Sequence, residues 1–135
     1  MNYEILDHTA DIKIRVFGND FREILENSAS AILEIINNED VNPDVSHNFE
    51  VSGEGKDQIL VRLINELIYI LQTEKLLIKN VQVEKEGEHK YMVFCKGIKI
   101  NNEHELNYDI KGATYHDLLI EKEGDRLKAE FVIDV

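Results

Sequence analysis

The chain has 135 residues, of which 43% are hydrophobic and 31% are charged. A chain of this length can bury roughly two-thirds of its unfolded surface, so we expect one domain over residues 1–135 that folds without a disulfide or a structural metal. Its 27 acidic and 15 basic residues give a net charge of -12, which would repel phosphates. We therefore expect no direct nucleic-acid binding. The acidity would speed encounter with a basic partner protein or with cations, but the simpler interpretation is that it only keeps the chain soluble.

The apolar segments are too short for a membrane protein. None reaches the roughly 20 residues that a spanning helix needs, and the N-terminal segment lacks the basic start and long apolar run of a signal peptide. We expect a cytoplasmic protein without membrane contact. Cys95 is the only cysteine and lies in an apolar run, so we predict that it is a core residue.

Two periodic patterns follow the N-terminal segment. Residues 12–17 alternate apolar and basic side chains, the pattern of a half-buried strand. The apolar residues of 20–36 recur with helical spacing, and Asp20 with Glu23 resembles a capping box. These residues therefore predict a strand followed by a capped helix.

The rest of the chain predicts one more helix and mostly strands. The predicted elements are a short strand at 45–55, a second helix at 57–75, and strands at 76–85, 89–100, 105–116, 117–124 and 126–135. Turn-prone segments join the later strands, which favours a meander-like sheet. We therefore expect an α+β fold in which two helices pack on a mostly antiparallel sheet.

Acidic residues near the two ends of the chain form the first candidate site. Asp7 and Asp11 flank His8 near the N-terminus, and the simplest interpretation is that they cap a local turn. In the strand 126–135, however, Asp134 alternates away from the apolar face, and Asp11 likewise lies on the polar face of its strand. If the two strands are neighbours, both acids and the terminal carboxylate of Val135 converge, and Ca²⁺ or Mg²⁺ would relieve their repulsion.

Other polar residues have less specific patterns. His116 follows Lys111 and is open to roles as an acid, a base or a partner-binding group, or it is simply an edge-strand histidine. Glu66 occurs amid the apolar stripe of the second helix, and the simpler interpretation is that it lies on the exposed face of that helix. There is no cysteine pair for zinc, and no phosphate-binding or dinucleotide-binding glycine motif.

Four motifs taken together resemble the archease family. They are "YEILDHTADI", "NELIYILQTE", "KGATYHDL" and the final "FVIDV", in this order and over essentially the whole chain. The resemblance implies an archease-like fold and a non-catalytic cytoplasmic protein that assists the RtcB-type RNA ligase in tRNA splicing and RNA repair. It further implies that this protein promotes guanylylation of the ligase, permits multiple turnovers and broadens the use of nucleoside triphosphates.

The resemblance also assigns residues. It implies a divalent-metal site formed by Asp11, Asp134 and Val135, with calcium as the ion, and Val135 would contribute only backbone or terminal oxygens. A second set of residues matches motif positions for partner binding or for support of the site. These are Asp7, His8, Glu66, Lys111 and His116.

Two other functions remain compatible with the same residues. One is a metal-dependent phosphoester hydrolase that uses Asp11, Asp134 and His116 around a cation, although the chain shows no evident nucleophile. The other is an adaptor whose acids form only a structural calcium site. Turnover by the isolated chain would favour the first, and activation of a partner that survives loss of Asp134 would favour the second.

Overall fold

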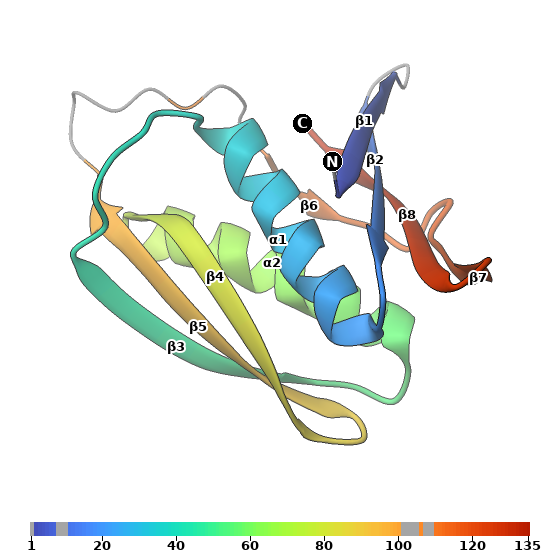
Figure 1. The fold of residues 1–135 in the computed structure, drawn as a ribbon. Coiled ribbons are helices and arrows are strands. Elements are labelled where there is room, and N and C mark those ends of the chain that lie inside the picture. The colour runs from blue at the N-terminus through green and yellow to red at the C-terminus, as the bar shows by residue number, and fades with distance from the viewer. Residues whose placement is uncertain (1, 8–10, 101–105, 107–109) are drawn as a thin grey trace.

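The computed structural model describes residues 2–7, 11–100, 106 and 110–135, and it contains two helices and eight strands in this part of the chain (Figure 1). The elements in chain order are β1 (Tyr3–Asp7), β2 (Asp11–Gly18), α1 (Phe21–Ile36), β3 (Val45–Ser52), α2 (Lys56–Thr73), β4 (Leu76–Gly87), β5 (Lys90–Lys99), β6 (Gly112–Ala113), β7 (Leu119–Glu123) and β8 (Arg126–Asp134). Neither helix combines the length and the apolar character needed to cross a membrane.

The strands form two antiparallel sheets. A five-stranded sheet has the order β1-β2-β8-β6, with β7 also paired to β8, and a three-stranded sheet has the order β3-β5-β4. Figure 1 shows both helices between these sheets: α1 contacts β2 on one side and β4 on the other, while α2 contacts β6 and β7 as well as β3 and β4. Each helix therefore buries more than one face.

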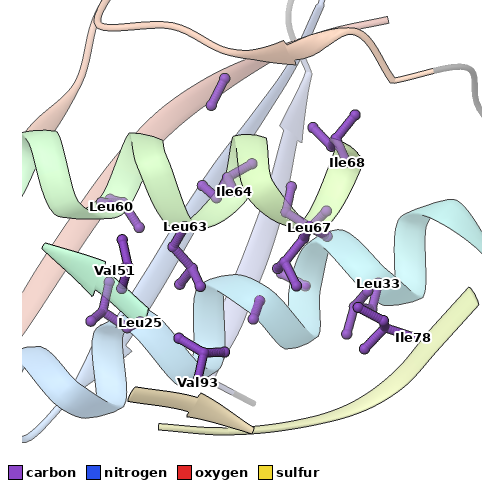
Figure 2. Close-up of a cluster of buried hydrophobic side chains, with 14 of the residues drawn as sticks. Leu25, Leu33, Val51, Leu60, Leu63, Ile64, Leu67, Ile68, Ile78 and Val93 are labelled. Atoms are coloured by element: carbon purple, nitrogen blue, oxygen red, sulfur yellow. The ribbon is translucent and has the colours of Figure 1, made fainter. Parts of the chain in front are cut away.

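Both helices have apolar residues at helical spacing, and α1 also begins with a capping side chain, whereas the N-cap of α2 is Gly55. In α1 the side chain of Asp20 accepts a hydrogen bond of 2.9 Å from the backbone N–H of Glu23, while Glu23 Oε1 accepts one from the N–H of Asn19. The predicted cap is confirmed, although its return bond reaches one residue further back. Figure 2 shows Leu63 and Leu67 of α2 extending toward α1 and the three-stranded sheet, so the main apolar cluster joins all layers.

The predicted α+β class, the two helices and the antiparallel strands are confirmed, but three features differ from expectation. β1 was not predicted. The later strands do not form one meander, because the β4–β5 hairpin pairs with β3 while β6, β7 and β8 join β2. Of the predicted strand at 105–116, only Gly112–Ala113 is a strand among the described residues. Backbone hydrogen bonds between distant segments are independent of side-chain type, so local patterns do not predict which strands pair.

Candidate functional site

Asp11 and Asp134 lie directly opposite each other on neighbouring strands. β2 and β8 pair antiparallel, with Asp11 opposite Asp134 and Ile12 opposite Ile133. Directly opposite residues of an antiparallel pair project from the same face with their Cβ atoms about 4.5–5.5 Å apart. Both acids are half-buried. The prediction that these strands are neighbours is confirmed, and the pairing register brings the two carboxylates together.

β6 flanks the other side of Asp134. Gly112 pairs with Asp134, and the backbone N–H of Lys111 donates a 2.9 Å hydrogen bond to the backbone carbonyl of Asp134. A Cβ at Gly112 would stand 3.1 Å from Oδ1 of Asn65, so the glycine permits a close approach of α2. The acidic pair, Asp11 and Asp134, thus lies on the neighbouring strands β2 and β8, and the next strand, β6, contacts α2.

Asn65 fixes β6 through a two-point contact. Its Oδ1 accepts a 2.8 Å hydrogen bond from the backbone N–H of Ala113, and its Nδ2 donates a 3.5 Å bond to the Ala113 carbonyl. Since the two backbone groups of one strand residue point to the same side, the amide of Asn65 takes the place of a further strand. α2 therefore positions β6, and β6 in turn flanks Asp134.

Charged side chains further along the same face of the sheet are paired. Arg15 Nε lies 2.6 Å from Glu130 Oε2 and Lys13 Nζ lies 3.9 Å from Glu130 Oε1, although Glu130 is only 9% exposed. The hydrogen bond that Arg15 donates to Glu130 is the main cause of the raised pKa of Arg15. No basic side chain of the described residues lies within salt-bridge distance of Asp134. Asp11 and Asp134 lie at one end of this face, beyond the ion pair of Arg15 and Glu130.

Comparison with known proteins identifies the family of this chain. A family model described as the archease protein family (MTH1598/TM1083) matches residues 3–135. The chain belongs to the archease family. It is 32% identical over 139 residues to an archease of Methanosarcina acetivorans, a match that covers 98% of this chain and 95% of that one.

Two solved structures share the archease fold of this chain. The solution structure of Methanobacterium thermoautotrophicum protein 1598 superposes with a TM-score of 0.84 at 25% identity and covers 99% of both chains. The crystal structure of an archease and possible chaperone from Thermotoga maritima superposes with a TM-score of 0.71 at 25% identity, covering 96% of this chain and 94% of that one. The expected archease-like α+β fold is confirmed.

The other residues that match archease motifs do not all gather at the acidic pair. Lys111 adjoins it through its backbone, whereas the half-buried Glu66 lies on α2 in a groove with Tyr69. His116 is 72% exposed and its Nε2 lies 3.4 Å from Asp117 Oδ2. The backbone of Asp7 pairs with Ile12.

Two predicted positions cannot be placed fully. His8 lies outside the described residues, and of Asp7 the structure describes only the backbone. Within the described residues, no three side chains of His, Cys, Asp or Glu gather closely enough to hold a metal ion by themselves. Any cation bound at Asp11 and Asp134 would therefore need backbone oxygens or further groups.

Sequence reasoning did not identify Asn65 and Glu130 as parts of the site. Asn65 had a weak signal: it is an amide in an archease motif, next to the apolar stripe of the second helix. Glu130 had a weaker one: it alternates with apolar residues on the same polar face as Asp134. Neither signal predicts which residue is contacted. Only the fold brings Asn65 to Ala113 and Glu130 to Arg15.

Proposed function

We propose that this archease-family protein activates an RtcB-type RNA ligase in tRNA splicing and RNA repair. It would promote guanylylation of the ligase and multiple turnover, broaden the use of nucleoside triphosphates, and act as an accessory protein in the cytoplasm rather than as a catalyst. Family membership over residues 3–135 is the observation that carries this proposal.

The charge of the chain supports a protein partner over RNA. A net charge of -12 speeds encounter with a basic protein surface and opposes contact with a phosphate backbone. Asp11 and Asp134 lie opposite each other at one end of the face that also carries the Arg15–Glu130 ion pair. These two carboxylates are our candidate contact for a cation or a basic group of the ligase.

We also propose that Asp11, Asp134 and Val135 hold a divalent cation, with calcium as the ion. The donor set fits: two carboxylates project from one face at paired positions, and Val135 follows Asp134 and offers backbone oxygen. Calcium accepts six to eight oxygen ligands in flexible geometry, so this set is incomplete without further oxygens. When bound, the cation would neutralise the two facing acids.

The residues of this chain would act by stabilising one conformation of the ligase. An activator shifts a conformational equilibrium only if it binds the competent state more tightly than the other. Asp11 and Asp134 would present the contact surface, while Asn65 and Gly112 keep β6 beside them. A firmly positioned surface loses less entropy on docking than a mobile one, so the proposed role requires this support.

The test measures RNA ligation by a cognate RtcB-type ligase at substoichiometric concentration with GTP, with and without this protein. The parent should restore multiple turnovers and raise the guanylylated fraction of the ligase, and a parallel series with ATP tests the breadth of nucleotide use. Asp134→Ala should weaken both effects, whereas Glu84→Gln removes one exposed acid elsewhere and should not.

Two results would count against the proposal. If the parent changes neither turnover nor guanylylation, the ligase is not its partner. If Asp134→Ala activates as well as the parent, the acidic pair is not used in activation, and any cation there has a structural role only. Hydrolysis of phosphoesters by the isolated chain would instead favour the metal-dependent hydrolase.

A further inference from the structure

The outer edge of β3 is long and regular. β3 pairs with β5 through eight consecutive residues, from Val45 opposite Gly97 to Ser52 opposite Lys90, without a register shift. No described strand pairs with its other side, and Figure 1 shows it at the margin of the three-stranded sheet. Such an edge presents unpaired backbone groups to any extended chain nearby.

The opposite edge of the same sheet is protected. On β4, Glu26 Oε2 accepts a 2.9 Å hydrogen bond from the backbone N–H of Val83, and Arg22 Nη1 donates a 3.2 Å bond to the Val83 carbonyl. β4 also has two register shifts against β5, which interrupt a regular edge. β3 contains no lysine, no proline and no bulge, the usual features that prevent pairing at an exposed edge.

The direction of the backbone groups on β3 follows from two contacts. Arg62 Nη1 donates a 2.7 Å hydrogen bond to the carbonyl of Ser52, whereas the N–H of Gly53 donates to the carbonyl of His89 on the β5 side. Consecutive strand residues direct their polar groups to alternate sides. The groups that face the outer edge therefore belong to Ser46, Asn48, Glu50 and Ser52, and of these the carbonyl of Ser52 is already bonded to Arg62.

A groove adjoins this edge. It has a volume of about 510 Å³ and lies between the second half of β3 and the exposed side of α2. Phe49, Glu50 and Val51 line it on the sheet side, and Glu66 and Tyr69 on the helix side. Arg62 and Asn65 of α2 also border it, and the guanidinium of Arg62 is bonded to the carbonyl of Ser52. Tyr69 is 56% exposed, so an apolar ring stands beside the unpaired edge together with a carboxylate.

We propose that this edge and groove bind an extended, basic segment of a partner protein as an additional strand. The backbone groups of Asn48 and Glu50 would supply the hydrogen bonds, and alternate side chains of the segment would reach the groove. A lysine or arginine there would meet the carboxylate of Glu66 and the face of Tyr69. The net charge of -12 favours such a segment over a second copy, which would bring the same charge.

The test uses the full chain and a fluorescent eight-residue peptide that alternates lysine with threonine. We expect saturable binding by fluorescence anisotropy that weakens with salt, and no binding of the same peptide with glutamate in place of lysine. Asn48→Pro removes an N–H that faces the open edge and no β3–β5 hydrogen bond, so proline is tolerable there. It should weaken binding by roughly tenfold or more, while Asn48→Ala should not.

Folding of each variant is checked by circular dichroism and urea unfolding, and Glu66→Gln provides a second variant that leaves the backbone unchanged. It should weaken binding of the lysine peptide and reduce its salt dependence. The proposal is overturned if the lysine peptide does not bind, if the glutamate peptide binds equally well, or if folded Asn48→Pro binds like the parent. A stable dimer in sedimentation, with β3 amides protected from exchange without peptide, would assign the edge to a second copy instead.

Discussion

Asp11 and Asp134 face each other across the β2–β8 pair although 123 positions separate them in the chain (134 − 11). The register places one near the start of β2 and the other at the end of β8, on the face where Arg15 and Glu130 form an ion pair further along. Asp11 and Asp134 thus lie side by side at one end of this face. Their proximity leads to the first prediction.

Calcium should stabilise the parent but not Asp134→Asn. A ligand that binds only the folded state stabilises it by about 2.7 kcal/mol when its free concentration is ~100 times Kd. Loss of one of two facing carboxylates removes a ligand of the proposed site, so the thermal midpoint of the variant should not respond to calcium. Differential scanning fluorimetry with and without calcium, after treatment with a chelator, measures this difference.

The control for that prediction is Glu84→Gln, which removes one exposed acid of β4 and should keep the full response to calcium. Equal gains in thermal midpoint for the parent and Asp134→Asn would show that calcium binds elsewhere or not at all.

Asn65→Ala should destabilise the fold by about 1–3 kcal/mol, because it leaves both polar groups of Ala113 without their partner. Urea unfolding gives this difference. Amide hydrogen exchange should also accelerate at Ala113, since its N–H loses the 2.8 Å bond to Asn65.

Asn65→Asp separates the two bonds of this contact. A carboxylate can still accept from the Ala113 N–H but cannot donate to the carbonyl, so we expect slower exchange at Ala113 than in Asn65→Ala. Unchanged exchange in both variants would mean that Asn65 does not hold β6 in solution.

Leu67→Ala should cost about 2–5 kcal/mol of unfolding free energy, because Leu67 is 2% exposed and its truncation leaves a cavity between the layers. Tyr69→Ala, two residues further along α2, is the matched control. Tyr69 is 56% exposed, so its truncation should change stability by only about 0.5 kcal/mol. Similar losses in both variants would contradict the assignment of Leu67 to the buried face.

The thiol of Cys95 should be nearly inert in the folded protein. Burial raises its pKa from the ordinary 9.0 to about 12, and the thiolate is the reactive form. At pH 8 a disulfide reagent should react only as fast as the chain opens, and rapidly in urea. Fast labelling of the native chain would show that β5 is accessible.

The raised pKa of Cys95 also affects the stability of the fold at high pH. The folded pKa lies above the unfolded one, so the contribution of the protonated thiol is fully present below pH 9.0 and is lost as the pH rises toward about 12. The unfolding free energy of the parent should therefore fall more steeply over this range than that of Cys95→Ala. Equal slopes would contradict the raised pKa.

Local patterns in the sequence were sufficient for most elements. Alternating apolar and basic residues predicted β2, and apolar residues at helical spacing predicted α1 and α2. The cap at Asp20 was also predicted, because a side-chain to backbone bond over three residues depends only on nearby atoms. The alternation of side chains along a strand predicted that Asp11 and Asp134 lie on polar faces. That their two strands are neighbours was only a hypothesis.

The sequence by itself determined the elements, the faces they bury and the face on which each acid lies. Only the tertiary structure decided that β2 pairs with β8 in the register that joins Asp11 to Asp134, that the later strands divide between two sheets, and that Asn65 caps Ala113. The physical reason is that backbone groups are the same in every residue. The partner of a strand is therefore set by how all the apolar faces pack together, not by the residues of that strand alone.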